Sequence, residues 1–312
     1  MSEIVLHSPG FLTTVQDTGR YGYQRYGMPV SGAMDVFSLQ LANALAGNNI
    51  NAACLESTLN GPEILFTTSG IIAVTGADMS PCKNGFPFPM NRTIPVKKGD
   101  VLSFGDLITG CRSYIAFGGG IEVPSVMGSR STYMRSKTGG IDGRPLLAGD
   151  RLRIGEALSS PLRKHFSAEE LPQYKPEQEI RIVRGPEADM FDPESLGRLL
   201  NSDYTVTANS DRMGYRLSGP ALKTITGKAD LISAGISFGT IQVPGDGQPV
   251  ILMADRPTTG GYNRIACVAG VDLTLVAQMK PGDRIRFREV TLKEASDLIR
   301  ERSIFIKQLF SF

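Results

Sequence analysis

The chain contains the stretch Val96–Phe104 (VKKGDVLSF), in which a glycine–aspartate turn leads into a strand-like run of alternating residues. Met279–Phe287 (MKPGDRIRF) repeats this pattern near the other end of the 312-residue chain, and Leu147–Ile154 (LAGDRLRI) is a shorter copy. Glycine and aspartate are typical of tight turns, and side chains that alternate along a strand face opposite sides of a sheet. The three copies predict short strands that begin directly after tight turns.

Further short apolar runs are bounded by turn residues. They are Gly70–Val74, Ser113–Phe117, Pro249–Met253 and Thr274–Val276, and glycine (35) and proline (19) are spread evenly among them. Runs of this length between turn residues favour strands. Many short strands with regular turns are typical of barrels and sandwiches, so the predicted class is mainly β with a few helices.

Three of those helices have recognisable start or stop signals. Apolar side chains recur at helical spacing across Met34–Leu45, and Gly47 supplies a stop. Asp192 precedes a proline, as a capping residue precedes the first helical position. Thr291 and Glu294 form the capping-box pattern that begins a terminal helix.

A second internal echo pairs Asp17–Tyr23 (DTGRYGY) with Asn209–Arg216 (NSDRMGYR). Two halves of similar β-rich construction explain both echoes, and the length fits two domains of about 150 residues each. Ser159–Gln178 carries several prolines and charges and few apolar runs, which is typical of a boundary. We therefore predict an N-terminal β-barrel domain at 1–165 and a C-terminal β-barrel domain with a terminal helix at 175–312.

Composition excludes several classes of function. The chain has 33 basic and 31 acidic residues and a net charge of +2, so a basic nucleic-acid surface is not expected. Its four cysteines show no CxxC spacing, which argues against a metal site. Met1–Glu3 leads straight into a strand-like run rather than a secretory signal, and no apolar stretch approaches roughly 18–20 residues. We expect a cytoplasmic protein with no metal, no nucleic-acid partner and no membrane contact.

The first segment that can carry chemistry is Thr13–Gly22, which continues to a helix start at Pro29–Asp35. It gathers Gln16, Asp17 and Arg20 among several glycines, which let a backbone approach a ligand closely. A guanidinium can hold a carboxylate through two hydrogen bonds, and helix N-termini favour anions. A purely structural reading, in which aspartate pairs with arginine and Ser31 caps the helix, has about equal weight.

The second such segment is Ile241–Tyr262, where polar, glycine-rich loops lie at both ends of one apolar strand. Gln242 lies before the first loop, and Asp255, Thr259 and Tyr262 follow the strand, where they could bind a small polar ligand. The first loop, Gly245-Asp246-Gly247, is better explained as a tight hairpin turn.

Other recognisable catalytic patterns are missing from the sequence. Gly118-Gly119-Gly120 follows a strand but lacks the lysine of a phosphate loop and the spacing of a dinucleotide fingerprint, so a bulge or tight crossing is expected. No Gly-x-Ser-x-Gly occurs, and the two histidines, His7 and His165, lie far apart. The chain alone shows no obvious means of driving chemistry with ATP.

Several long motifs resemble one protein family. Gly10–Arg20 with Ser31–Asp35 is similar to the N-terminal signature of the allophanate hydrolase subunit 2 family, also called the biotin-dependent carboxyltransferase family. Ser210–Leu217 and Gly239–Tyr262 are similar to its C-terminal signatures, so the resemblance spans nearly the whole chain. It implies two cyclophilin-like β-barrel domains.

The resemblance also implies a function. Stand-alone bacterial members usually serve as the C subunit of 5-oxoprolinase, which opens 5-oxo-L-proline to L-glutamate with ATP hydrolysis. Their main partner in that enzyme is the B subunit, and the enzyme also contains the A subunit. Two alternatives stay open: a regulatory protein that antagonises a B-type kinase inhibitor, and a carboxyltransferase component that acts on urea or a related amide. No covalently attached biotin is expected, because the nearest approach to an acceptor motif, Gln278–Pro281, lies in a predicted turn.

Residue chemistry then suggests roles for the two segments. We expect Gln16, Arg20, Gln242, Thr259 and Tyr262 to bind the small-molecule substrate, with Arg20 holding its carboxylate. The two carboxylates, Asp17 and Asp255, are the catalytic candidates: each can polarise water or orient a neighbour.

Overall fold

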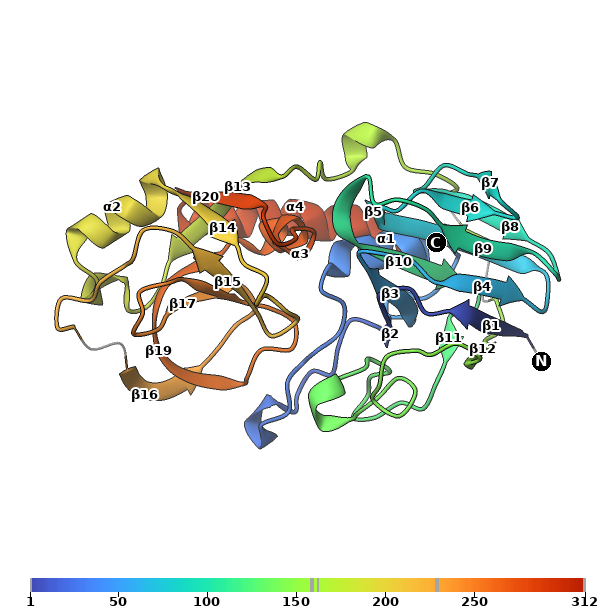
Figure 1. Cartoon of the computed structure of the whole chain (residues 1–312), viewed down its shortest axis with the longest axis horizontal. Helices are drawn as coiled ribbons and strands as arrows, with labels where there is room; N and C mark the ends of the chain where they lie inside the picture. The colour runs from blue at the N-terminus through green and yellow to red at the C-terminus, as the bar shows by residue number, and fades with distance from the viewer. Residues whose placement is uncertain (1, 158–159, 162, 228–229, 311–312) are drawn as a thin grey trace. The chain divides into compact units, whose positions relative to one another are not determined.

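The computed structural model describes residues 2–157, 160–161, 163–227 and 230–310 (Figure 1). The chain divides into two compact units. The first unit comprises residues 1–21, 31–173 and 304–312, and the second comprises residues 22–30 and 174–303. Residues 22–30, which lie in the predicted domain 1–165, thus belong to the second unit, and residues 304–312, which lie in the predicted domain 175–312, belong to the first. The two domain ranges remain predictions.

The first unit is built on two antiparallel sheets. Their neighbouring strands are, in the seven-stranded sheet, β11 (Ile121–Glu122), β12 (Arg151–Ile154), β1 (Glu3–Ser8), β4 (Glu63–Phe66), β9 (Val101–Phe104), β6 (Pro81–Lys83) and β7 (Phe86–Pro87). The five-stranded sheet has the order β2 (Leu12–Gln16), β3 (Cys54–Thr58), β10 (Thr109–Phe117), β5 (Gly70–Asp78) and β8 (Thr93–Val96).

Alternation along these strands creates the core of the first unit. Ile4 and Leu6 of β1 pack in one apolar cluster with Ile115 and Phe117 of β10, so the two sheets share this core. The opposite face of the five-stranded sheet is covered by helix α1 (Val36–Leu45), whose buried residues pack against side chains such as Tyr114. The prediction of a helix at this place is confirmed.

The three glycine–aspartate turns have the same hydrogen-bond pattern, and each leads into a strand as predicted. In each, the aspartate side chain accepts from the N–H three residues earlier: Lys97 to Asp100 at 2.8 Å, Leu147 to Asp150 at 2.8 Å and Lys280 to Asp283 at 3.0 Å. The glycines between them have φ values of 88° to 94°, which L-residues adopt only with strain. The repeated sequence is therefore a repeated turn.

A closed barrel forms the second unit. Its strands follow one another in the ring β13 (Glu177–Arg184), β20 (Arg284–Glu289), β14 (Asp203–Val206), β15 (Gly214–Ser218), β18 (Val250–Leu252), β17 (Thr240–Val243) and β19 (Thr259–Val268), and β19 pairs again with β13. Strand β16 (Asp230–Gly235) adds to the outside of β19. The mainly β class with barrel architecture is confirmed.

One strand of this barrel shows clearly why the alternation arises. Ile285 and Phe287 of β20 are buried in the barrel, whereas the arginines that alternate with them lie on its outer face. There Arg286 pairs with Asp203 at 2.9 Å and Arg288 with Glu179 at 2.8 Å. Arg284, Arg286 and Arg288 therefore form a solvated face of the strand, in agreement with the predicted alternation along Met279–Phe287.

The remaining helices are α2 (Pro193–Asn201), α3 (Leu273–Ala277) and α4 (Leu292–Phe310). Asp192 caps α2 and the Thr291–Glu294 capping box begins α4, and both predictions are confirmed. The strand predicted at Thr274–Val276 is wrong, because these residues form α3 directly after a 3₁₀ turn. A short apolar run has no period that separates a strand from a buried helix.

Among the described residues, no helix is both long and apolar enough to cross a membrane.

Candidate functional site

The three candidates of the first segment all contact one distant stretch, residues 129–132. Asp17, Gln16 and Arg20 each make at least one hydrogen bond to this stretch, which lies more than 100 residues further along the chain. The same stretch covers the free edge of β2, since the N–H of Thr132 donates to the carbonyl of Val15 at 2.9 Å. The structure thus brings the predicted residues together within the first unit.

Asp17 holds this stretch through both carboxylate oxygens. Oδ1 accepts from the Ser129 hydroxyl at 2.7 Å and from the Gly19 N–H at 2.8 Å. Oδ2 accepts from the Arg130 N–H at 2.6 Å. Three donors from the protein engage the carboxylate, so its local role is to fix the two segments against each other.

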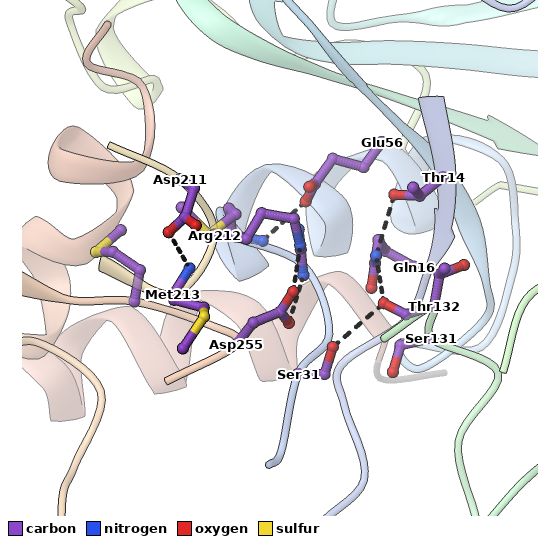
Figure 2. A network of polar contacts seen from close by, with 12 residues as sticks. Thr14, Gln16, Ser31, Glu56, Ser131, Thr132, Asp211, Arg212, Met213 and Asp255 are labelled. Carbon is purple, nitrogen blue, oxygen red and sulfur yellow. Dashed lines mark hydrogen bonds and ion pairs between the residues drawn. The ribbon is translucent and has the colours of Figure 1, made fainter. Parts of the chain in front are cut away.

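Gln16 is fully buried at the end of β2. Its Nε2 donates to Thr14 Oγ1 at 3.0 Å and to the carbonyl oxygen of Thr132 at 3.1 Å (Figure 2). The Ser31 hydroxyl donates to the same carbonyl at 3.3 Å. The carboxamide is therefore held in one orientation.

Arg20 is buried without any exposed surface, which is unusual for so large a cation. Its Nη2 donates to the carbonyl oxygen of Ser131. Gly139 lies against this contact: a Cβ at that position would be 2.0 Å from the Ser131 oxygen and 2.9 Å from Nη2. Asp17 bonds Ser129 and Arg130 instead of pairing with Arg20, so the structural reading of that pair is wrong.

The segment that precedes α1 is fixed by a buried network. The N–H of Met34 donates to Glu56 Oε2 at 2.8 Å, and the hydroxyl of Tyr114 donates to the same oxygen at 2.7 Å. Tyr114 in turn accepts from the N–H of Asp35 at 2.7 Å. Burial and the two neighbouring carboxylates raise the pKa of Tyr114 well above its usual value, so its hydroxyl stays protonated and able to donate. Asp35, rather than Ser31, caps the helix.

The echo of this region in the second unit also presents a buried arginine. Asp211 accepts from the N–H groups of Met213 and Gly214 at 2.8 and 3.1 Å, which forms the turn around Arg212. Arg212 then makes a two-pronged ion pair with Asp255, with Nε to Oδ2 at 2.9 Å and Nη2 to Oδ1 at 3.1 Å (Figure 2). Both side chains are about 95% buried. Asp255 is thus engaged by a cation on both oxygens.

Two of the other candidates in the second unit lie together. Gln242 of β17 donates from Nε2 to the main-chain oxygen of Tyr262 on β19 at 3.2 Å. The Tyr262 side chain is half exposed, and Thr259 at the start of the same strand is exposed. Gly260 allows this packing, because a Cβ there would lie 2.9 Å from Gln242 Nε2.

Asp255 stands apart from this pair within the barrel. Gln242 pairs with Val250 at the beginning of β18, whereas Asp255 follows the other end of that strand. Gly245–Gly247 closes the hairpin between β17 and β18, with the Gly247 N–H donating to the Pro244 carbonyl at 3.0 Å, as the sequence predicts.

The three consecutive glycines do not fit a phosphate cradle. Their N–H groups are all committed to the protein: Gly118 to Ile71, Gly119 to Asn48 and Gly120 to Phe117. A Cβ on Gly119 would lie 2.0 Å from the carbonyl oxygen of Gly155, which is a tight crossing of two backbones. No group of three or more His, Cys, Asp or Glu side chains gathers as a cation site in the part of the chain that is described.

Some site residues were missed by sequence reasoning. The stretch Ser129–Thr132 (SRST) is polar and follows a glycine, which is a signal of the same kind as Asp17–Gly19. Arg212 lies in the echo of Arg20, and the alignment of the two motifs points to it. Glu56 and Tyr114 have no such signal, because each sits in an ordinary strand.

Both units are rich in strands, and each holds a buried arginine, Arg20 in the first and Arg212 in the second. The chain belongs to the carboxyltransferase domain family, subdomain A and B, whose family model matches residues 26–289.

Two relatives and one solved structure give the particular likeness. The chain is 40% identical over 300 residues to the 5-oxoprolinase C subunit of Escherichia coli, and the match covers 96% of this chain and 95% of that protein. It is 39% identical over 323 residues to urea amidolyase of Lachancea kluyveri, with 97% of this chain and 18% of the relative covered. The crystal structure of the K. lactis urea amidolyase superposes with a TM-score of 0.92 at 36% identity, over 98% of this chain and 20% of that one.

Proposed function

We propose that the chain is the C subunit of an ATP-dependent 5-oxoprolinase, which converts 5-oxo-L-proline to L-glutamate together with the A and B subunits. The observation that carries this proposal is the 40% identity to the Escherichia coli protein of that name, over 95% of its length. The chain would act as part of a lactam hydrolase that turns over only when its partner subunits are present.

Within this complex the chain would bind and orient the substrate. Gln16, Arg20, Gln242, Thr259 and Tyr262 are the proposed contacts, and holding reactants in a productive geometry lowers a barrier considerably. The two aspartates act indirectly in this proposal. Asp17 fixes the stretch that contacts Gln16 and Arg20, and Asp255 fixes Arg212, because protein donors engage both carboxylates.

ATP supplies the activation of the lactam carbonyl that water alone does not provide. The glycine run of this chain does not fit a triphosphate, because its three N–H groups bond protein acceptors. We therefore propose that the complex uses ATP at a site other than this glycine run, and that this chain orients the substrate.

Omission of single components tests the proposal. The purified A and B subunits are mixed with 5-oxo-L-proline and ATP, with and without this chain, and glutamate is quantified. Glutamate formation that requires all three proteins and ATP supports the proposal. Tight pairing with the B subunit without turnover under any condition contradicts it and supports the regulatory alternative.

A carboxyltransferase that acts on urea or a related amide is the second candidate. The 39% identity to urea amidolyase over 97% of this chain favours it. Such an activity needs biotin on another protein or domain, so inhibition by avidin separates it from the first proposal. Lys280 belongs to the segment Gln278–Pro281, which is the part of the sequence most like a biotin-acceptor motif, and it forms an ion pair with Asp283 at 2.9 Å.

A further inference from the structure

The carboxamide of Gln16 has one atom that the described part of the protein does not use. Nε2 donates to Thr14 Oγ1 and to the Thr132 carbonyl, whereas Oε1 is buried and accepts no hydrogen bond from the described residues (Figure 2). Buried side-chain oxygens without a partner are uncommon in folded proteins. This oxygen therefore calls for a donor that the described part of the chain does not provide.

The assignment of oxygen and nitrogen in this carboxamide is determined by its neighbours. The Thr132 carbonyl is only an acceptor, so the atom that faces it at 3.1 Å must be the nitrogen. Rotating the amide by half a turn would place two acceptors against each other. The atom left over is thus an acceptor, and its ligand must be a donor.

Two hydroxyl groups that belong to the same network donate to other acceptors. Thr132 Oγ1 donates to the Val15 carbonyl at 3.0 Å, and Ser31 Oγ donates to the Thr132 carbonyl at 3.3 Å. Neither group can satisfy Gln16 without giving up a buried hydrogen bond of its own. The unused acceptor is therefore built into the arrangement of the site.

We propose that Gln16 determines specificity by accepting the ring N–H of the substrate lactam at Oε1. This inference rests on the proposed oxoprolinase function. 5-Oxoproline offers a single amide N–H next to the carbonyl that reacts, and its carboxylate and carbonyl oxygens cannot serve an acceptor. A site that pairs with an N–H group disfavours an analogue without it, because the acceptor then stays buried and unpaired.

The test compares the lactam with its ring-oxygen analogue, 5-oxotetrahydrofuran-2-carboxylate, in the complex with the A and B subunits. ADP release measures turnover of both compounds, and the quantity compared is kcat/KM for the lactam divided by kcat/KM for the ring-oxygen analogue. Gln16→Leu should lower this ratio about 10-fold or more, because leucine has no acceptor for the lactam N–H and so cannot favour the lactam. Intrinsic differences in ring reactivity cancel when the two proteins are compared.

Gln278→Leu is the matched control, because Gln278 is another buried glutamine and belongs to the second unit. It should leave the ratio unchanged. Competition on the unmodified complex covers the case in which Gln16→Leu does not fold: the ring-oxygen analogue should bind about 10-fold more weakly than the lactam. Equal binding of the two compounds overturns the inference.

The outcomes separate this inference from the function on which it rests. An unmodified complex that forms no glutamate removes the proposed function and the inference with it. A complex that forms glutamate but keeps the same lactam preference after Gln16→Leu overturns the inference alone.

Discussion

At the scale of single residues, the first unit concentrates its polar contacts on one short stretch. Residues 129–132 receive hydrogen bonds from Gln16 and Arg20, and they donate to Asp17. Each of these side chains is buried, so each lost bond leaves a polar group without water to replace its partner. Local stability and the shape of the proposed site are thus linked.

Asp17→Asn should lower the free energy of unfolding by about 1–3 kcal/mol. The amide that replaces one carboxylate oxygen would turn a donor towards the Arg130 N–H or the Gly19 N–H, both of which are donors themselves. Urea denaturation measures the change. Asp189→Asn at an exposed position serves as control, and an equal loss in both variants would contradict this account.

Tyr262→Ala should raise KM for 5-oxoproline in the complex about 10-fold while changing stability by less than ~1 kcal/mol. The ring is half exposed, and the bond from Gln242 goes to the main-chain oxygen, which the substitution keeps. Steady-state kinetics and thermal unfolding provide the two readouts. Phe86→Ala removes another exposed ring outside the predicted site, and a similar KM for both variants would exclude a substrate contact.

At the scale of elements, helix caps and tight turns could be predicted from local sequence, whereas the identity of a short apolar run such as Thr274–Val276 and the distant pairings could not. The caps of α2 and α4 and the three glycine–aspartate turns depend on residues a few positions apart, so a single sequence reveals them. The contact of Arg20 with Ser131 spans 111 positions, and nothing in the spacing of either segment announces it. The candidates Gln16, Asp17 and Arg20 could be found because they are neighbours, but the stretch that holds them could not.

A glycine-to-alanine substitution can be compared between the repeated turn, where φ is positive, and helix α2, where it is not. Gly282→Ala should destabilise the protein by about 1–2 kcal/mol, since its φ of 94° is costly for alanine although no atom lies within 4 Å of the new Cβ. Gly197→Ala inside α2, with equally open space, should instead stabilise it by about 0.5–1 kcal/mol. Thermal unfolding that shifts in the same direction for both variants would refute the turn conformation.

A pH dependence follows from the turn at Asp150. The ion pair with Arg144 and the hydrogen bond from the Leu147 N–H lower the pKa of Asp150. A depressed folded pKa stabilises the protein fully above the unfolded value of about 3.9, and this contribution is lost as the pH falls through the lower folded value.

Asp150→Asn should therefore lower the free energy of unfolding at neutral pH. Below about pH 4 the difference in this free energy between the variant and the unmodified protein should become smaller. Urea midpoints between pH 3 and pH 7 give the comparison. Asp106→Asn, at an exposed position, should show no such convergence. A constant gap for Asp150→Asn over the whole range would rule out the assigned ion pair as its cause.

At the scale of the whole molecule, the two units share short motifs but differ in their sheets, with two antiparallel sheets in the first unit and a closed barrel in the second. Each carries a buried arginine in related motifs, Arg20 and Arg212, and each begins strands after the same turn. The family resemblance could be found from these motifs because they are long and keep their order. The closure of the second unit by β19 on β13 could not, because that pairing joins segments more than 80 residues apart.

The most direct test of the proposed function is a titration of this chain into fixed amounts of the A and B subunits with 5-oxo-L-proline and ATP. Glutamate formation should rise from background, depend on ATP and saturate at a fixed molar ratio of this chain to its partners. A rate that stays at background at every concentration of the chain, or that the two partners reach without it, would contradict its role as a required subunit.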